Sequence, residues 1–396
     1  MIRVAFTLLG GHGWLGGHHY LVNLLSSLRT YQSEAVTPVL FVSAEVSEEA
    51  LKDFRAIPGV DIIRSPHFSR SRRLPRLAQA LLFGLDANAV ELFRAARIDV
   101  VFEPAQFYGW RLPMPAIAWI PDFQDRHLPR MFSRAAHLQK WLGRWTWILS
   151  RRTFMLSSED ARADCERFYP ATRGRTRVVR FAVPPAPRAS DAERAEVIAR
   201  YGLPEVFFFL PNQFWRHKNH LCVVRALRLL KQAGHECVVA ATGNSADLRH
   251  RDHFDHLRRE VDGGGLTQNF RTLGVVPYRH VQVLMQSAAA LINPSYCEGW
   301  STTVEEAKSS GTPLILSDLN VHREQAAGSA LFFNPDAPEQ LAAHLSQYQP
   351  ADARQRELLA AQARAAALNR LAQFAQEFSA VLTECLHPLE QGISGQ

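Results

Sequence analysis

The stretch that decides the fold is Asn293–Ala307, which reads NPSYCEGWSTTVEEA. An apolar run ends at Asn293, a polar turn follows, and the hydroxyl and acidic residues after it are typical of the start of a helix. Capping explains either glutamate of the first helical turn, but it does not explain Glu298, which lies in the turn itself. A carboxylate there can accept sugar hydroxyls, while the helix N-terminus behind it can receive a phosphate.

Outward from this stretch, short apolar runs alternate with helical patterns in two series, which predicts parallel sheets covered by helices, an α/β fold. The first series predicts strands at Arg3–Leu9, Thr37–Ser43, Val60–Ser65, Asp99–Glu103, Ala116–Ile120, Thr153–Ser157 and Arg177–Ala182. The second predicts strands at Val206–Leu210, Cys237–Thr242, Arg271–Val275, Ala289–Asn293, Pro313–Ser317 and Leu331–Phe333. Helical patterns include Leu21–Leu28, Leu74–Ala96 and the long alanine-rich segment Ala351–Leu386.

The two series are separated by Pro184-Pro185-Ala186-Pro187. Proline cannot donate to a sheet ladder and stiffens the chain, so we expect a linker at 184–188. The expected domains are residues 1–183 and 189–365, with residues 366–396 as a C-terminal helix. Because ligands bind outside the carboxyl ends of parallel strands, we expect a cleft between the two sheets.

The composition narrows the classes of protein that the chain could represent. Its 396 residues are 47% hydrophobic and 21% charged, which is typical of a folded enzyme. Five scattered cysteines indicate neither a disulfide framework nor a zinc site. No apolar run approaches the roughly 20 residues that cross a bilayer, and the N-terminus lacks the pattern of a secretory leader. The net charge of +7 suits nucleic acid, anionic lipid or phosphorylated substrates, but no nucleic-acid-binding motif accompanies it, so we expect no nucleic acid partner.

A glycine motif follows the first predicted strand. Gly11–Gly16 matches G-x-G-x-x-G, which in a dinucleotide-binding unit is followed about 20 residues later by an acidic residue. Here Glu45 lies 29 residues beyond Gly16. The motif is therefore compatible with NAD, with another phosphate or sugar contact, or with turn geometry alone.

The spacing of Glu298 and Glu306 resembles the E-x7-E motif of the retaining nucleotide-sugar glycosyltransferases of family 4, also called glycosyl transferases group 1. The flanking residues agree with this family at Gly274-Val275-Val276, Pro294-Ser295, Glu298-Gly299, Glu306-Ala307 and Gly311-Thr312-Pro313. The resemblance covers the whole second half in order and is looser in the first half. It implies the GT-B fold, two Rossmann-like doubly wound domains facing a central cleft, with the C-terminal helix packing back on the N-terminal domain.

The resemblance implies a donor site in the second domain. Lys218 stands at the position of the family's pyrophosphate-binding lysine, while Gln213 stands where an arginine is usual and Arg216 lies close enough to replace that cation. Glu298 would bind sugar hydroxyls, and Glu306 would bind the ribose. Further donor contacts are implied for Gly16, Gly17, Gly243, Asn244, Gly274, Val275, Gly299, Trp300, Ser301, Thr302 and Thr303.

The acceptor side departs from the family pattern. Many members carry His-Asp seven residues before a proline, whereas here Pro121 replaces the histidine and Asp122 and Pro129 are kept. Proline can neither orient a sugar nor act as a base, so Asp122 or His127 would take over part of that work. We expect Lys218, Glu298 and Asp122 to be catalytic, and Arg126 and His127 to face the acceptor.

The activity implied is retaining transfer of a hexose from a UDP-, GDP- or dTDP-sugar to a glycan or polyprenyl-linked saccharide, in the assembly of bacterial surface polysaccharide or glycoconjugate. Family members generally use no metal, no metal-binding D-x-D motif stands out, and we expect no cofactor. The alternatives are a nucleotide-sugar epimerase of the same fold and a non-catalytic scaffold that binds nucleotide sugars.

Residues 130–152 combine aromatic and basic side chains. Trp141, Leu142, Trp145, Ile148 and Leu149 recur at helical spacing, among the bases Arg134, Lys140, Arg144, Arg151 and Arg152. Such a helix can lie on an anionic bilayer, or it can be an internal helix with a charged face, and the cluster Arg70–Arg76 fits both interpretations. We expect a cytoplasmic protein, placed on the inner face of the cytoplasmic membrane under the first interpretation.

Overall fold

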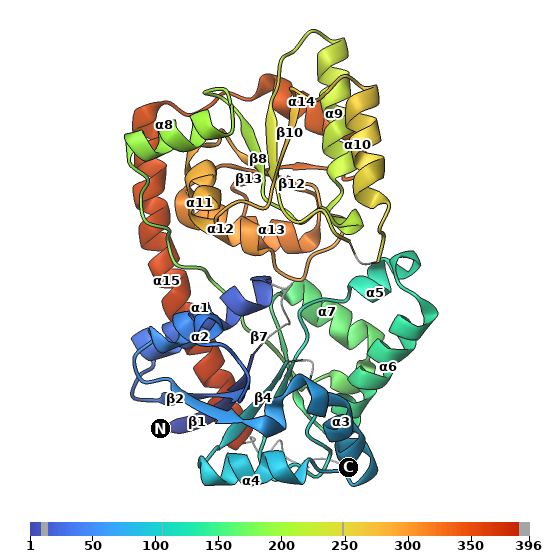
Figure 1. The fold of residues 1–396 in the computed structure, drawn as a ribbon, viewed down its shortest axis with the longest axis vertical. Helices are drawn as coiled ribbons and strands as arrows, with labels where there is room; N and C mark the ends of the chain where they lie inside the picture. The colour runs from blue at the N-terminus through green and yellow to red at the C-terminus, as the bar shows by residue number, and fades with distance from the viewer. Residues whose placement is uncertain (9–14, 105, 248, 388–396) are drawn as a thin grey trace, which may run out of the picture. The chain divides into compact units, whose positions relative to one another are not determined.

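The computed structural model describes residues 1–8, 15–104, 106–247 and 249–387 (Figure 1). The chain divides into two compact units. Unit 1 comprises Met1–Asp125, Phe132–Ala182 and Arg370–Gln396, and unit 2 comprises Arg126–Met131 and Val183–Asn369. Each unit is built around its own parallel sheet.

Unit 1 holds a seven-stranded sheet in the order β3-β2-β1-β4-β5-β6-β7, in which all neighbouring strands are parallel. Its strands are β1 (Ile2–Thr7), β2 (Val36–Ser43), β3 (Asp61–Ser65), β4 (Val100–Pro104), β5 (Ala116–Trp119), β6 (Thr153–Leu156) and β7 (Thr176–Val178). Its helices are α1 (Leu15–Tyr31), α2 (Glu48–Arg55), α3 (Arg73–Leu82), α4 (Ala87–Ala95), α6 (Arg134–Leu149) and α7 (Glu159–Phe168), and α5 (Gln124–His127) lies at its boundary with unit 2.

The sheet of unit 1 is covered on both faces. On one side, Ala80 of α3, Trp147 of α6 and Cys165 of α7 share a buried core with strand residues of β5 and β6. On the other side, Phe378 of α15 (Ala353–Leu386) lies 5.9 Å from Phe6 and 5.8 Å from Phe102 between ring centroids. The end of α15 is therefore part of the aromatic core of unit 1.

Unit 2 holds a six-stranded parallel sheet in the order β10-β9-β8-β11-β12-β13. Its strands are β8 (Phe208–Leu210), β9 (Val239–Thr242), β10 (Phe270–Gly274), β11 (Leu291–Asn293), β12 (Leu314–Ser317) and β13 (Ala330–Phe333). Its helices are α8 (Asp191–Arg200), α9 (His220–Gln232), α10 (His253–Gly263), α11 (Tyr278–Ser287), α12 (Thr302–Ser310), α13 (Asn320–Ala326), α14 (Pro338–Gln347) and the first part of α15.

Alternation along β8 explains why the strands of unit 2 are continuous apolar runs. Successive side chains point to opposite faces of a sheet, so Phe208 and Leu210 join a core with α9, α10 and α14. Phe209 points the other way and joins a core with residues of α8, α11, α12 and α13. Because such a strand is buried on both faces, its sequence is apolar throughout and does not alternate between apolar and polar residues.

The sequence predicted all thirteen strands found among the described residues. The helical pattern over Leu74–Ala96 was wrong as a single element, because it forms α3 and α4. Gly84, between them, has φ +74°, and a Cβ there would lie 2.6 Å from the indole nitrogen of Trp110. Asp86 then starts α4 by accepting a hydrogen bond from the Ala89 amide at 3.1 Å. The break therefore depends on a long-range contact as well as a local cap.

Each sheet reverses its direction of growth at its centre, between β1 and β4 in unit 1 and between β8 and β11 in unit 2. Loops that leave two such strands diverge to opposite faces and open a crevice at the carboxyl edge, where ligands of doubly wound sheets bind. The loops that follow β8 and β11 carry Lys218 and Glu298.

Candidate functional site

The centre of the candidate site is an ion pair between the loops that follow β8 and β11. Lys218 ends a short 3-10 turn, Arg216–Lys218, and its Nζ lies 2.6 Å from Oε1 of Glu298. The two side chains are 14% and 9% exposed. Two residues eighty positions apart are thus joined at the switch point of the sheet.

The carboxylate of Glu298 is held ionised by its neighbours. Burial by itself raises its pKa, but the Lys218 ammonium, His322 and a hydrogen bond from Ser295 outweigh burial and lower the pKa to about 2. The Ser295 hydroxyl lies 2.7 Å from Oε1, whereas no residue in the described part of the chain donates to Oε2. One oxygen of Glu298 is therefore engaged within the protein and the other remains able to accept.

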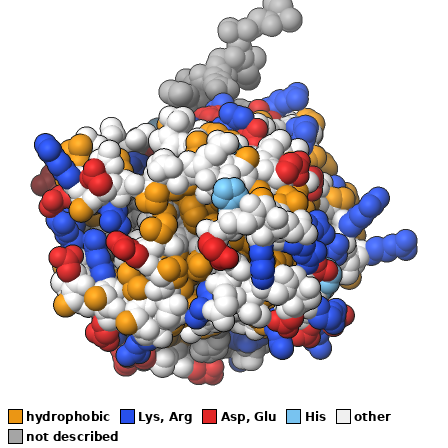
Figure 2. Space-filling model, turned by 90° about the horizontal axis from the view of Figure 1, so that it is seen from above, with side chains coloured by type: hydrophobic (Ala, Val, Ile, Leu, Met, Phe, Trp, Pro, Cys, Tyr) orange, Lys and Arg blue, Asp and Glu red, His pale blue; other side chains and the backbone are white. Residues whose placement is uncertain are grey.

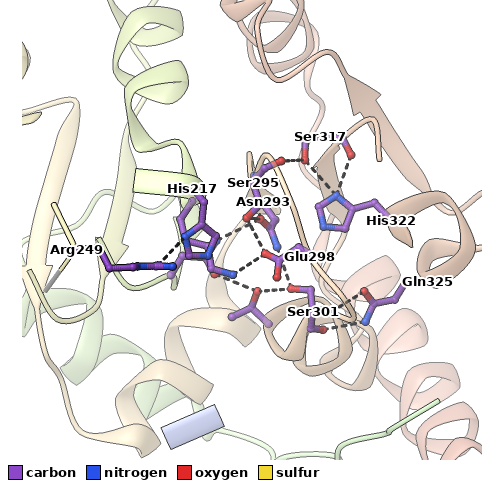
Figure 3. Close-up of polar contacts among 12 residues, drawn as sticks. His217, Arg249, Asn293, Ser295, Glu298, Ser301, Ser317, His322 and Gln325 are labelled. Carbon is purple, nitrogen blue, oxygen red and sulfur yellow. Dashed lines mark hydrogen bonds and ion pairs between the residues drawn. The ribbon is translucent and has the colours of Figure 1, made fainter. Parts of the chain in front are cut away.

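Asn293 organises the turn that carries Glu298 (Figure 3). Its Nδ2 donates to the Ser301 hydroxyl at 2.9 Å, and its Oδ1 accepts from the Ser295 hydroxyl at 2.7 Å. Asn212 donates to the same oxygen at 3.3 Å, and its own oxygen accepts from Thr303 at 3.4 Å. The ends of β8 and β11 and the start of α12 thereby form one polar network.

The start of α12 is fixed by Gln325 of α13. The Gln325 amide accepts from the Ser301 N–H at 3.1 Å and donates to the Ser301 carbonyl at 2.8 Å and to Glu305 at 3.0 Å. Ser301 is the N-cap, but its hydroxyl makes no capping bond to the helix backbone. The helix N-terminus beside Glu298 carries a positive dipole that favours an anion.

Asn219 ties the Lys218 loop to its surroundings. It has left-handed backbone geometry, φ 55° and ψ 40°, which asparagine tolerates better than most residues. Its buried amide donates to the carbonyls of Pro294, at 3.1 Å, and Pro335, at 2.9 Å. The residue directly after Lys218 is therefore anchored to the loop that leads to Glu298.

A second group of predicted donor residues lies where β8, β9 and β10 end. Gln213, where the family has an arginine, accepts from the Asn244 amide at 2.7 Å, and the Gly243 amide donates to the Gly274 carbonyl at 2.9 Å. A Cβ on Gly243 would lie 2.5 Å from the Asn212 carbonyl oxygen, so the close approach requires glycine. Val275 is 75% exposed beyond this group.

Arg216 does not approach the ion pair as a cation in this structure. Its side chain is exposed, and its backbone N–H donates to buried Asp247 at 3.1 Å. His217 beside it is buried, and burial together with the nearby Lys218 charge lowers its pKa to about 3. The turn thus presents a neutral imidazole inside and Lys218 beside it.

Glu306 belongs to a separate part of the site. Its carboxylate accepts from the Tyr278 hydroxyl at 2.8 Å, and burial raises its pKa to about 7 despite that hydrogen bond. Pro184, Met285 and Ser310 lie around the same small pocket. Glu298 and Glu306 are thus on one loop and helix but have different partners and opposite pKa shifts.

Three further predicted residues occupy the turn and start of α12. Gly299 is buried, and Trp300 is half-buried with the Lys308 ammonium 5.8 Å from its ring centroid. Thr302 is the first residue of the helix and is half-buried.

The predicted residues of the first half occupy other places. Gly16 and Gly17 lie in the first turn of α1, while most of the glycine motif, residues 11–14, falls outside the described residues. Asp122 accepts from the Gln124 amide at 3.1 Å at the start of α5, and Arg126 and His127 lie in α5 itself.

Several residues of this site were missed in the sequence. Asn293 and Ser295 stand beside Glu298 in the stretch quoted above, and their polarity at a strand end is a usable signal. Gln325 and His322 come from α13, and only tertiary packing brings them to the site. The buried His322 donates from Nδ1 to the Ser317 carbonyl at 2.8 Å, and its Nε2 is buried without a hydrogen-bond partner among the described residues.

In the described ranges, no three His, Cys, Asp or Glu side chains form a group that could hold a metal ion. Among the helices that the structure describes, none combines the length and apolar character needed to cross a bilayer.

Comparison with known proteins agrees with this architecture. The family described as Glycosyl transferases group 1 matches residues 193–365. The O-antigen chain mannosyltransferase RfbU of Salmonella typhimurium is 27% identical over 132 residues, 33% of this chain and 35% of that protein. The match thus spans about a third of the length of this curated relative.

Solved structures resemble the whole chain. Anabaena Alr3699/HepE in complex with UDP and glucose has a TM-score of 0.69 at 16% identity, covering 97% of this chain and 100% of that one. A glycosyltransferase from Rickettsia africae has a TM-score of 0.71 at 14% identity, covering 99% of both chains. WaaG, a glycosyltransferase involved in lipopolysaccharide biosynthesis, has a TM-score of 0.58 at 13% identity, covering 99% of this chain and 100% of that one.

These likenesses confirm the predicted fold, and the matched segment contains both members of the ion pair at the switch point of the second sheet. The chain therefore has the GT-B fold of these solved structures, and residues 193–365 match the family described as Glycosyl transferases group 1.

Proposed function

We propose that this protein transfers a hexose from a nucleoside diphosphate sugar to a glycan or a polyprenyl-linked saccharide, with retention of anomeric configuration and without a metal. The observation that carries the proposal is the Lys218–Glu298 ion pair beside the N-terminus of α12. It places a cation, an ionised carboxylate and a helix dipole together where doubly wound sheets bind ligands.

In this proposal Lys218 and the start of α12 stabilise the leaving diphosphate. Cleavage of the sugar–phosphate bond leaves negative charge on the departing phosphate and positive charge on the anomeric carbon. A fixed ammonium and helix amides supply preorganised stabilisation for that negative charge, at no cost of reorganisation during the reaction. Arg216, exposed on the same turn, adds a second cation when its side chain turns toward the donor.

Glu298 would bind hydroxyls of the donor sugar through Oε2, to which no described residue donates a hydrogen bond. Glu306 would bind the ribose hydroxyls, and its contact with the Tyr278 hydroxyl supports this role, because the carboxylate already accepts a hydroxyl donor there. Gly243, Asn244, Gly274 and Val275, at the ends of the neighbouring strands, would line the base. In unit 1, Gly16, Gly17 and Asp122 would contribute to the donor or acceptor, with Arg126 and His127 toward the acceptor.

The acceptor class is proposed from the relatives. One relative is named as an O-antigen chain mannosyltransferase, and WaaG is described as acting in lipopolysaccharide biosynthesis. Both names concern saccharides of the bacterial surface, so we propose a growing surface polysaccharide or glycoconjugate as acceptor, with the enzyme in the cytoplasm.

The test is a panel of UDP-, GDP- and dTDP-sugars, each incubated with the protein with and without a bacterial lipid extract. Acceptor-dependent release of nucleoside diphosphate from one donor, unaffected by EDTA, is the expected result. Conversion of the sugar without release would show an epimerase, and binding without turnover of any donor would show a scaffold. Either of those outcomes would overturn the proposed transfer.

A further inference from the structure

Helix α3 presents its leucines to solvent. Leu74 and Leu82 are each 75% exposed, and Leu77 and Leu81 are 39% and 38% exposed. Arg76 of the same helix turns inward and pairs with buried Asp86 at 3.0 Å, while Arg73 at the start of the helix is exposed. A surface helix normally has the opposite arrangement, with its apolar face toward the core.

Helix α6 has the same inversion. Leu138, Trp141, Leu142 and Leu149 are between 44% and 74% exposed and follow one helical stripe. Its inner face holds Arg144, whose guanidinium makes two hydrogen bonds to buried Asp125, at 2.6 and 2.7 Å. The structure therefore changes the interpretation of residues 130–152, because part of the basic and aromatic pattern is interior and only the remainder faces solvent.

The two helices belong to one side of unit 1 (Figure 1). Ala80 of α3 and Trp147 and Ile148 of α6 are members of a single buried core. Phe83, 70% exposed, and Trp110, 49% exposed, extend the apolar surface beyond the end of α3, where Gly84 touches the Trp110 indole. Exposed apolar surface on this scale marks an interaction site in soluble domains.

The charge around these helices has one sign. Residues 66–85 contain four arginines and no acidic residue, and residues 132–152 contain four arginines and one lysine and no acidic residue. Arg70, Arg72, Arg73, Arg134 and Arg151 among them are exposed. By contrast, basic and acidic side chains are interspersed on the face shown in Figure 2.

We propose that the exposed faces of α3 and α6, with Phe83 and Trp110, form a surface that docks on an anionic lipid bilayer. Large apolar side chains can enter the interface between headgroups and acyl chains, and the surrounding arginines can bind anionic headgroups. A nucleic acid would match the arginines but not the solvent-facing leucines. This inference goes beyond the proposed function, because it requires neither donor nor acceptor to be correct.

The test is sedimentation with vesicles of phosphatidylcholine, with or without about a third phosphatidylglycerol, at low and high salt. The full chain should bind the anionic vesicles at low salt and bind neutral vesicles weakly. Arg70→Gln/Arg72→Gln/Arg73→Gln should weaken binding about fivefold per arginine, hence about a hundredfold. Leu82→Gln/Phe83→Gln should weaken it about tenfold or more.

Matched control variants are available on the exposed first part of α15. Arg354→Gln/Arg356→Gln/Arg364→Gln removes the same charge, and Leu358→Gln/Leu368→Gln removes exposed leucines. Both should bind vesicles as the wild type does, and all variants should keep the wild-type circular dichroism and thermal midpoint.

Three results would overturn the proposal. The first is equal binding of neutral and anionic vesicles, and the second is a loss in the α15 variants equal to that in the α3 variants. The third is unchanged vesicle binding in both α3 variants while binding of a DNA oligonucleotide is lost, which would assign the surface to nucleic acid. The readout is vesicle binding, so a failed panel of sugar donors would leave it unaffected.

Discussion

Two ion pairs between a basic side chain and a glutamate, one buried in unit 1 and one partly buried in unit 2, are built differently. In unit 1, Glu103 is fully buried and takes hydrogen bonds from Arg152 at 2.8 and 3.2 Å and from the Tyr108 amide at 3.1 Å. In unit 2, Lys218 makes its contact with Glu298 through a single short bond. The first pair is closed on all sides, and the second lies between loops at the end of the sheet.

The difference separates a pair that supports the fold from one that can change partners. The planar fork of Arg152 fits a carboxylate bidentately and also donates to the Gly109 carbonyl at 2.8 Å, whereas a lysine is a point charge with three rotatable donors. Among the residues that the structure describes, only Glu298 is within hydrogen-bonding distance of the Lys218 ammonium. Its remaining protons are available to a phosphate.

The largest effect on stability should follow from removing the arginine of the Arg152–Glu103 pair. Arg152→Met should lower the free energy of unfolding by about 3–5 kcal/mol, because it leaves the Glu103 carboxylate buried without its counter-charge. Urea unfolding followed by tryptophan fluorescence measures this change. A loss below about 1 kcal/mol, as for an exposed ion pair, would remove the distinction between the two pairs.

Loss of the Lys218–Glu298 pair should instead lower the rate of sugar transfer. Lys218→Ala should lower kcat/KM about 10²–10³-fold, the effect of losing one preorganised donor, about 2.7–4 kcal/mol. Lys308→Ala is the matched control, because Lys308 also pairs with a buried glutamate of unit 2, Glu305, at 2.8 Å. The control should lose more stability and less turnover than Lys218→Ala.

The same comparison can contradict the assignment. If Lys218→Ala transferred sugar at the wild-type rate, or if both lysine variants lost stability and turnover in parallel, Lys218 would be a structural residue. Nucleotide release with saturating acceptor, together with thermal midpoints, distinguishes these cases.

The sequence predicted the sheets well because buried parallel strands are short apolar runs that are visible without knowledge of their partners. It failed at Leu74–Ala96, where the break comes from Gly84 lying against Trp110, a contact between distant parts of the chain. The inverted exposure of α3 could not be predicted either, since a leucine stripe in a sequence does not say which side faces the core.

At the candidate site, the residues carried by the family motif were predicted, and the residues that position them were not. Lys218 and Glu298 were predicted from the resemblance to the family, and the structure shows the two side chains 2.6 Å apart. Gln325 could not be identified from the sequence, because its role depends on hydrogen bonds to the backbone of Ser301, 24 residues away. Polar residues that act through backbone groups leave no motif of their own.

Substituting Gln325 should have an effect of intermediate size, and it tests whether this residue positions the start of α12. Gln325→Leu should cost about 1–3 kcal/mol of stability, because it leaves the N–H and carbonyl of Ser301 without their buried partners. The start of α12 should then be poorly held, and kcat/KM should fall about tenfold, through donor KM more than kcat. Gln325→Glu keeps the acceptor for the Ser301 amide but places a second carboxylate against buried Glu305, to which the Gln325 amide donates at 3.0 Å, so it should not recover the stability. An unchanged donor KM in Gln325→Leu would confine the residue to folding.

The smallest effect should be a pH dependence that contrasts Glu306 with Glu298. The Glu298 pKa of about 2 keeps that carboxylate ionised throughout, whereas the Glu306 pKa of about 7 makes it protonate near neutrality. Because a carboxylate accepts hydroxyl donors more strongly than a carboxylic acid does, donor KM should fall a few-fold as the pH rises from about 6 to 8. Glu306→Gln should make this profile flat, and Tyr278→Phe should move its midpoint upward, because the Tyr278 hydrogen bond lowers the Glu306 pKa.

The ionisation of Glu306 should also make stability depend on pH: the free energy of unfolding should fall as the pH rises, while donor affinity increases. The folded chain keeps a proton on Glu306 that the unfolded chain releases near its ordinary pKa of 4.5. The contribution of Glu306 to the free energy of unfolding is therefore fully present below pH 4.5 and is lost as the pH rises through about 7. Relative to Glu306→Gln, the wild type should lose stability over this interval while donor binding improves. If stability and donor affinity rose together with pH, the buried, protonated state assigned to Glu306 would be wrong.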